Sequence, residues 1–398
     1  MSSPAIILFC YNRANYLERT LASLATLVGL EQMAVYISQD GYDESVHNMS
    51  LSFGSGPLSP PHTKAFEHWQ RERIPQLHAK QPGHAWLTQH YKWGLDGVFL
   101  NRSHSHAIVI EDDMLFSPDF LTYFQATAPV LDLDPTLWCI STWNDNGLTY
   151  FNWDPQKLFR TSYFPGLGWM LRRELWLELG PRFPRQAWDH WMRLPSTSKG
   201  RECISPEVNR NFNIGEVGAN MQKAMFKRHF KAMGWYQGST NRSAGADLGD
   251  LSYLSLDSFS DHMVSLLQRA QVWEGAVTQV KLNQQPPGQV NLILYKEESY
   301  PRTARQLKIW PFPRGHHQHI VALPYKGSTW LLADVRQCPL LPKHMRVYPS
   351  PTLQDLAAPP DTSCTDACKA EGLVCSAEDF WFINTCEALA KHFPCSAG

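Results

Sequence analysis

Three consecutive carboxylates, Glu111, Asp112 and Asp113, directly follow the apolar run 107–110 (AIVI). This run is short and rich in β-branched residues, so it predicts a strand that is buried on both faces. Adjacent like charges at the end of such a strand repel one another unless a cation or hydrogen-bond donors compensate them. Hard oxygen ligands suit Mn²⁺ or Mg²⁺, which often hold a substrate diphosphate as well. The triplet is therefore a candidate metal site, and a solvated acidic turn after a core strand is the alternative.

A fourth carboxylate, Asp189, lies among large apolar neighbours in the segment 187–193 (AWDHWMR). Burial among such side chains desolvates an acid and raises its pKa, as the role of general base requires. A salt bridge with Arg193 or Arg185 is the competing interpretation. His190 could also be the base, and the residues alone leave these alternatives open.

The elements that must position these carboxylates read as alternating strands and helices. Apolar runs predict strands at 5–10, 33–38 and 107–110, and helical spacing predicts helices at 16–24 and 86–100. Strand–helix–strand units build parallel sheets, and ligands bind at the ends of their strands. Residues 48–84 are rich in Pro, Gly, Ser and His and predict a long loop with a little helix. The sequence has neither a GxGxxG nor a GKS/GKT pattern, so a bound nucleotide would need a metal and side chains to hold its phosphates.

The bulk composition is that of a globular protein with two or three domains. The chain has 398 residues, of which 43% are hydrophobic and 18% charged, and its net charge is −1. This charge balance predicts no nucleic-acid partner and no anionic membrane surface as partner. No run approaches the ~18 apolar residues of a membrane helix, and no basic region precedes an apolar one at the start of the sequence. We therefore expect a catalytic portion separated from its membrane anchor, or an incomplete gene start.

The cysteines are unevenly placed. Six of the nine crowd the last part of the chain, at Cys338, Cys364, Cys368, Cys375, Cys386 and Cys395. Such crowding predicts three disulfides formed in an oxidising compartment, and a zinc site that includes Cys364 and Cys368 is the alternative. N-glycosylation sequons at Asn48, Asn101 and Asn241 fit a secretory route.

An ordered set of motifs resembles the protein-linked β-1,2-N-acetylglucosaminyltransferases, namely N-acetylglucosaminyltransferase I and its O-mannose-specific relative. The set covers roughly residues 4–335 and comprises Glu111–Asp113, Leu137–Ser141, Trp143–Gly147, Phe164–Trp169, Trp188–Arg193 and Gly200–Cys203. The acidic triplet alone is a weak signal, but the ordered set is a strong one.

The resemblance implies a GT-A fold and an inverting, metal-dependent transfer from UDP-GlcNAc, with Mn²⁺ or possibly Mg²⁺ as cofactor. In that family pattern Asp113 matches the metal ligand, and Asp189 matches the base that deprotonates the acceptor hydroxyl. Glu111 and Asp112 match residues that contact the donor sugar and ribose. Further positions match the donor pocket and the loop that closes over it: Arg13, Asp40, His90 and Asn220. A single displacement needs one base and one cation but no nucleophile, which agrees with the residues present.

The resemblance also implies a cysteine pairing, with two departures from the family. Cys139 and Cys203 match positions that pair, so we expect a disulfide there. Gly41 stands where N-acetylglucosaminyltransferase I has a cysteine, so Cys10 is expected to be a free buried thiol. His190 stands where that enzyme has a second Asp, which alters the surroundings of Asp189.

The resemblance and the patterns divide the chain into three parts. We predict a GT-A catalytic domain at 1–237, a smaller α+β second domain at 250–337, and a disulfide-rich C-terminal segment at 338–398. In the second domain, strands at 290–295 and 319–323 flank a helix near 303–309. We interpret the histidines 316, 317 and 319 of this domain as part of a loop that leads into a strand, and not as a metal site.

The favoured function is transfer of GlcNAc to the α-1,3-mannose of a high-mannose N-glycan in the Golgi lumen, on a mannose-terminated glycoprotein acceptor. The triplet and 118–120 (PDF) favour this branch of the family, whereas 201–203 (REC) and 217–220 (VGAN) lean toward the O-mannose branch. A sugar-binding protein that has lost catalysis on the same fold is the other alternative.

Overall fold

The computed structural model describes residues 4–55, 63–74, 82–151, 154–218, 222–238, 247–277, 282–349, 351–376, 379–383 and 386–393. The chain forms two compact units, Met1–Leu341 and Pro342–Gly398. Both predicted domains, 1–237 and 250–337, lie within the first unit, and their status as separate domains stays a prediction.

The strands and helices of the first unit alternate through its N-terminal part. The strands are β1 (Ala5–Cys10), β2 (Ala34–Asp40), β3 (Ala65–Arg71), β4 (His106–Glu111), β5 (Met114–Phe116), β6 (Leu137–Ser141), β7 (Leu158–Thr161), β8 (Trp169–Arg172), β9 (Glu202–Pro206), β10 (Asn211–Asn213), β11 (Gln271–Val272), β12 (Val290–Tyr295), β13 (Ile320–Tyr325) and β14 (Ser328–Asp334). The α-helices are α1 (Ala14–Ala25), α2 (Glu44–Ser55), α3 (Pro82–Asp96), α4 (Phe120–Leu133), α5 (Arg173–Leu179), α6 (Trp188–Met192), α7 (Pro195–Ser198), α8 (Lys223–Met225), α9 (Leu256–Gln268) and α11 (Tyr300–Leu307). Short 3₁₀ and π turns are η1 (Leu30–Gln32), η2 (Gly97–Asn101), η3 (Gly180–Arg182), η4 (Phe226–Phe230) and η5 (Ser252–Leu254).

The main sheet has the strand order β3-β2-β1-β4-β8-β6-β9-β7. Strands β3, β2, β1 and β4 are parallel, whereas β8 runs antiparallel to both β4 and β6. This arrangement confirms the predicted α/β class and the predicted parallel strands at 5–10, 33–38 and 107–110. Because β1, β2 and β4 point the same way, their carboxyl ends meet at one edge of the sheet.

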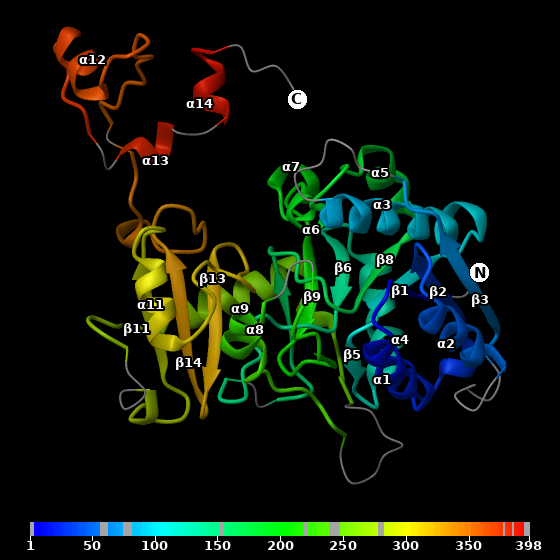
Figure 1. The fold of residues 1–398 in the computed structure, drawn as a ribbon. Coiled ribbons are helices and arrows are strands. Elements are labelled where there is room, and N and C mark those ends of the chain that lie inside the picture. The colour runs from blue at the N-terminus through cyan, green and yellow to red at the C-terminus, as the bar shows by residue number, and fades with distance from the viewer. Residues whose placement is uncertain are drawn as a thin grey trace. The chain divides into compact units, whose positions relative to one another are not determined.

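Helices cover both faces of the main sheet (Figure 1). On one face, side chains of β1 pack with helices α3, α5 and α6 in a single buried cluster that includes Phe9, Tyr91, Trp176 and Trp188. Helices α1, α2 and α4 lie on the opposite side of the sheet. Burial on both faces explains why β1 and β2 consist entirely of buried residues, as their apolar runs predicted.

The prediction of a long loop at 48–84 is wrong in part. Helix α2 extends to Ser55, and residues 65–71 form β3, which pairs parallel to β2 at the edge of the sheet. Most of the β3 side chains are exposed or half-buried, so the segment (AFEHWQR) has no apolar run that could signal a strand. Its strand conformation is determined by pairing with β2, a contact that local sequence patterns do not record.

A second, four-stranded sheet has the order β11-β12-β14-β13. The predicted strands at 290–295 and 319–323 and the helix between them are confirmed as β12, β13 and α11. A second buried cluster joins this sheet to residues that follow β6, and it includes Trp143, Phe230, Trp310 and Trp330. Residues far apart in the sequence thus share one core within the first unit.

The second compact unit, considered by itself, contains η6 (Lys343–Met345), α12 (Cys364–Ala370), α13 (Phe380–Ile383) and α14 (Cys386–Ala390). Ser363 caps α12, because its hydroxyl accepts a hydrogen bond from the Asp366 backbone N–H. Among the described sulfur atoms of this unit, those of Cys364, Cys368 and Cys375 are free thiols. With these three thiols unpaired, the prediction of three disulfides among the six C-terminal cysteines is wrong for this structure; Cys395 and the Cys386 side chain lie outside the described part.

Candidate active site

The end of β1 and the end of β4 bring a guanidinium and two carboxylates together. Arg13 follows β1, and one of its terminal nitrogens is bonded to Asp112 Oδ1 and lies 2.8 Å from Asp113 Oδ2. Both carboxylates are almost completely buried. Three of the residues that the sequence singled out therefore meet at the carboxyl edge of the parallel strands, where such sheets bind ligands.

Glu111 completes the acidic triplet and bonds to a different partner. Its Oε1 accepts a hydrogen bond of 2.5 Å from the Tyr91 hydroxyl on α3. Tyr91 is held between two aromatic rings, Phe9 of β1 and Trp188 of α6, with centroids 4.2 Å away in each case. The tyrosine thus fixes the direction of Glu111 through packing on both faces of its ring.

The electrostatics of the triplet show an excess of negative charge. Burial, followed by repulsion from Asp113, raises the pKa of Glu111 to about 7, and the same two causes raise the pKa of Asp112 to about 7. Burial lowers the pKa of Arg13, but attraction from Asp113 and Asp112 outweighs this and raises it. One arginine does not balance three carboxylates, so the site is suited to a cation.

The surroundings of Asp113 fit a divalent cation held by one protein carboxylate. Asn213 donates from Nδ2 to Asp113 Oδ1 at 3.0 Å, and the Ile214 backbone N–H donates to the Asp113 carbonyl at 2.8 Å. A Cβ atom at Gly215 would overlap Asp113 Oδ2, so the absence of a side chain there keeps space beside this oxygen. No group of three His, Cys, Asp or Glu side chains in the described part of the chain could hold a metal ion. A cation at Asp113 would therefore need oxygens from a substrate, as Mg²⁺ commonly takes from phosphates.

Asp40 and His90 lie at the neighbouring strand end. The Asp40 carboxylate is buried and bonds to Arg71 and Arg73, at 2.7 Å each. The His90 Nε2 atom lies 2.7 Å from the Ser38 hydroxyl of β2. Burial, and then the charges of Arg71 and Arg73, lower the pKa of His90 well below its ordinary value, so this ring is neutral.

Asp189 lies on α6, directly after a residue that packs against this part of the site. Trp188 stacks on Tyr91, and Tyr91 is the residue that donates to Glu111. Burial raises the pKa of Tyr91, and the negative charges of Glu111, Asp113 and Asp189 raise it further. Asp189 pairs with Arg193 at 2.8 Å, which is one of the salt bridges that the sequence left open. The His190 side chain is exposed.

Asn220 lies outside the described residues, so its predicted place in the closing loop stays a prediction. The described segment before it does approach the site, because Arg13 donates from its other terminal nitrogen to the Val217 carbonyl at 3.2 Å. A Cβ atom at Gly218 would lie 3.5 Å from the same nitrogen.

Sequence reasoning missed a group of residues that adjoins Asp189. The Arg193 guanidinium lies over the Tyr163 ring at 4.9 Å, and Arg314 lies near the same ring at 5.3 Å. Arg314 also pairs with buried Asp145 at 2.7 Å and stacks on Trp310 at 3.7 Å. The second Asp145 oxygen, Oδ2, is buried without a hydrogen-bond partner. Only the polar corner 144–147 (NDNG) signalled this group in the sequence, since Arg314 comes from a distant segment.

The two sulfur atoms of Cys139 and Cys203 lie 1.98 Å apart, at disulfide distance, as the resemblance led us to expect. They join the paired strands β6 and β9. Cys10 is a free, buried thiol, which confirms the expectation for that residue.

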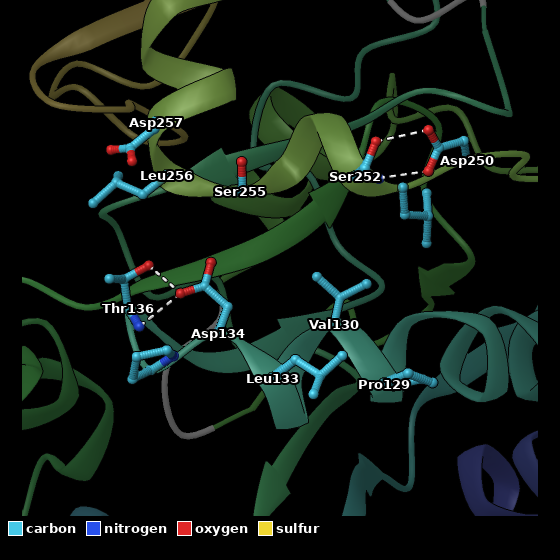
Figure 2. A pocket seen from close by; sticks show the side chains of 12 residues that line it. Pro129, Val130, Leu133, Asp134, Thr136, Asp250, Ser252, Ser255, Leu256 and Asp257 are labelled. Carbon is cyan, nitrogen blue, oxygen red and sulfur yellow. Dashed lines mark hydrogen bonds between the residues drawn. The ribbon is translucent and has the colours of Figure 1, made fainter.

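A separate cavity of about 630 Å³ lies between the end of α4 and the η5–α9 segment. Figure 2 shows its apolar side chains together with two locally bonded carboxylates, Asp134 with Thr136 and Asp250 with Ser252. None of the residues predicted for catalysis or donor binding lines it. The carboxyl edge of the main sheet therefore remains the candidate site.

Comparison with known proteins gives a family match over most of the chain. The model of the GNT-I family matches residues 1–336. A curated relative from Arabidopsis thaliana, an alpha-1,3-mannosyl-glycoprotein 2-beta-N-acetylglucosaminyltransferase, is 37% identical over 278 residues. This match covers 69% of the chain and 60% of that relative, so the chain spans about 60% of the relative's length.

Solved structures show a weaker likeness. A mannosyltransferase from Pyrobaculum calidifontis in complex with GDP-Man and Mn²⁺ has 17% identity and a TM-score of 0.36, covering 52% of this chain and 55% of that one. S. aureus TarS in complex with UDP-GlcNAc has 13% identity and a TM-score of 0.36, covering 54% and 59% of the two chains.

Proposed function

The chain belongs to the GNT-I family, and from this membership we propose that it is an inverting glycosyltransferase with a GT-A fold. It transfers GlcNAc from UDP-GlcNAc in β-1,2 linkage to a mannose of a protein-linked glycan. The favoured acceptor is the α-1,3-mannose of a high-mannose N-glycan. The observation that supports this most directly is that the charges of Glu111, Asp113 and Asp189 all act on Tyr91, which lies next to Trp188 and donates to Glu111.

The donor side of the reaction is assigned to the ends of β1, β2 and β4. Asp113 would hold Mn²⁺ or Mg²⁺, which when bound neutralises charge on the leaving diphosphate. Arg13 supplies a fixed positive charge beside Asp113, suited to the same diphosphate. Glu111 and Asp112 are assigned to the donor sugar and ribose, and Asp40 and His90 to the remainder of the nucleotide pocket. Asn220 is proposed for the loop that closes over the donor.

Asp189 is assigned as the general base. In an inverting transfer the acceptor hydroxyl attacks the anomeric carbon in one step, while the bond to the diphosphate oxygen breaks and UDP leaves. The Asp189 carboxylate receives the hydroxyl proton. Its salt bridge with Arg193 holds one oxygen in place, so the carboxylate keeps a constant direction toward the acceptor.

The setting of this reaction is proposed to be the Golgi lumen, within the secretory pathway. None of the helices in the described residues is both long enough and apolar enough to cross a bilayer.

The test is transfer of radiolabelled GlcNAc from UDP-GlcNAc to a high-mannose N-glycan and, in parallel, to an O-mannosyl peptide. Each acceptor is assayed with Mn²⁺, with Mg²⁺ and with EDTA. The variant Asp189→Asn removes the base, and Asp261→Asn, which alters an exposed carboxylate on α9, is the matched control.

We expect metal-dependent labelling of the N-glycan that Asp189→Asn abolishes while UDP-GlcNAc binding persists. Labelling of the O-mannosyl peptide alone would move the acceptor to the other branch of the family. Full activity in Asp189→Asn would contradict the assignment of the base. Donor binding without transfer to either acceptor would favour a non-catalytic sugar-binding protein.

A further inference from the structure

A groove of about 370 Å³ lies where the edge strand β3 meets the end of α3 and η2. The indole rings of Trp69 and Trp93 line it, with centroids 6.1 Å apart and planes nearly perpendicular. Gln70, Asp96 and Arg102 add polar groups to the same lining. A sugar ring has apolar C–H faces and a rim of hydroxyls, so aromatic faces beside hydrogen-bonding side chains suit a carbohydrate.

The floor of the groove is rigid. Trp69 stacks on Tyr36 at 4.4 Å, and its indole N–H donates to Glu67 at 2.8 Å. Glu67 accepts in turn from Arg102 at 2.7 Å. A Cβ atom at Gly97 would lie 2.7 Å from the Trp69 ring, so the glycine lets this ring lie close against η2. An aromatic surface that is held in place loses little entropy when a ligand packs on it.

Trp93 in contrast is 39% exposed, and Leu100 of η2 is 47% exposed. Neither is explained by the proposed transfer reaction, whose residues lie at the carboxyl edge of the sheet. The Trp93 side of the groove is therefore open to a ligand.

The sequon Asn101–Arg102–Ser103 lies on the rim of this same groove. Asn101 and Arg102 both line it, and all three residues of the sequon are exposed. Ser103 adopts a positive φ of 56°, which turns the chain immediately after the acceptor asparagine. An Asn in an exposed turn on a secreted protein is an acceptor for N-linked glycans.

We propose that Asn101 carries an N-linked oligosaccharide whose first sugars pack into the Trp69–Trp93 groove. In this modification the Asn101 side-chain nitrogen bonds to the anomeric carbon of an oligosaccharide carried on a lipid diphosphate. The bond from that carbon to the diphosphate oxygen breaks, the lipid diphosphate leaves, and the amide gives up one proton. The proposal rests on the secretory route of the proposed function but is independent of the transferase activity.

The position of Asn101 indicates that its own glycan is the ligand of the groove. A sugar attached at Asn101 begins at the rim of the groove, so its effective concentration over Trp93 is high without any separate binding step. A free glycan would have to pay the full entropic cost of association at the same surface.

The experiment expresses the full chain behind a secretion leader in a eukaryotic host, so that modification is measured whether or not the chain is an active transferase. Glycopeptide mass spectrometry reads the occupancy of Asn101, with Asn101→Gln as the negative control. Thermal unfolding is then measured before and after peptide-N-glycosidase treatment in protein that carries Asn48→Gln and Asn241→Gln, so that only the Asn101 glycan is removed, and in the same protein with Trp93→Ala. Phe393→Ala, which truncates another exposed aromatic residue, is the matched control.

We expect Asn101 to be occupied, and removal of its glycan to lower Tm by roughly 2 °C or more, an effect of the size that about 1 kcal/mol produces. The shift should persist in Phe393→Ala and disappear in Trp93→Ala. Peptide-N-glycosidase should also remove the Asn101 glycan more slowly from the folded natural protein than from folded Trp93→Ala.

Three results would overturn the proposal. If Asn101 carries no glycan in the secreted protein, the proposed modification does not occur. If Asn101 is occupied but its glycan is removed as fast as in Trp93→Ala and its removal does not change Tm, the glycan does not pack in the groove. The third result is that glycosylated protein binds free chitobiose or a mannose-terminated glycan and that Trp93→Ala abolishes this binding. The groove would then be a subsite for a separate ligand.

Discussion

A terminal nitrogen of Arg13 lies 2.8 Å from Asp113 Oδ2, which joins the end of β1 to the end of β4 through one ion pair. The two residues are 100 positions apart in the sequence, and the parallel pairing of their strands brings them together. Asp113 is buried whereas the Arg13 side chain is 28% exposed, so the guanidinium forms the solvent-facing side of the pair. A phosphate arriving from solvent would meet the arginine and the carboxylate side by side.

Asp113→Asn is expected to lower kcat/KM for transfer by about 100-fold or more, because the substitution removes the charge that would hold the metal. The amide keeps the size of the side chain, so the fold should be retained. The measurement is initial rate against Mn²⁺ concentration, with Tm recorded for each protein. Asp261→Asn again serves as the control for an exposed carboxylate. A variant with unchanged rate and unchanged metal requirement would exclude Asp113 as the ligand.

Arg314→Met is expected to destabilise the first unit by about 3–5 kcal/mol, because it leaves the buried Asp145 carboxylate without its charged partner. Methionine retains the apolar stem that packs on Trp310. The free energy of unfolding is measured in urea, and Asp145→Asn in the same chain should recover part of the loss.

Arg182→Met is the control for this prediction. Arg182 is exposed and lies 3.4 Å from Glu178, so its loss should cost less than about 1 kcal/mol. An Arg314→Met effect as small as that of Arg182→Met would show that the Asp145 pair adds little to stability.

Stability is expected to fall in acid partly through Glu202. Burial alone raises the pKa of this carboxyl, but hydrogen bonding and charge from His317, followed by a hydrogen bond from Arg160, lower it to about 2. A carboxyl with a depressed pKa stabilises the folded protein above its unfolded pKa of about 4.3. That contribution, on the order of 3 kcal/mol, is lost as the pH falls from about 4.5 toward 2.

The measurement is the urea midpoint between pH 6 and pH 3 for the natural sequence and for Glu202→Gln. The variant should be less stable at pH 6 and should lose less stability on acidification. Glu298→Gln, which alters an exposed carboxylate paired with Arg336, should change the pH profile little. Parallel profiles for Glu202→Gln and the natural protein would contradict the role assigned to Glu202.

The sequence by itself determined the class of the fold and predicted several site residues. Strands β1, β2 and β4 are buried on both faces, so their apolar runs identify them without tertiary information. Carboxylates directly after such a run are conspicuous because local sequence rarely places charge beside a core strand. The ordered motifs then identified the family, since their order along the chain is a property of sequence alone.

Only the tertiary structure decided which partners these residues have. The edge strand β3 has no apolar run, and its conformation depends on pairing with β2. Trp188, the residue before Asp189, stacks on Tyr91, a contact between residues 97 positions apart. Arg314 reaches Tyr163 and Asp145 from a segment about 150 to 170 residues away. Such contacts depend on how separate elements pack, and no pattern of neighbouring residues records that packing.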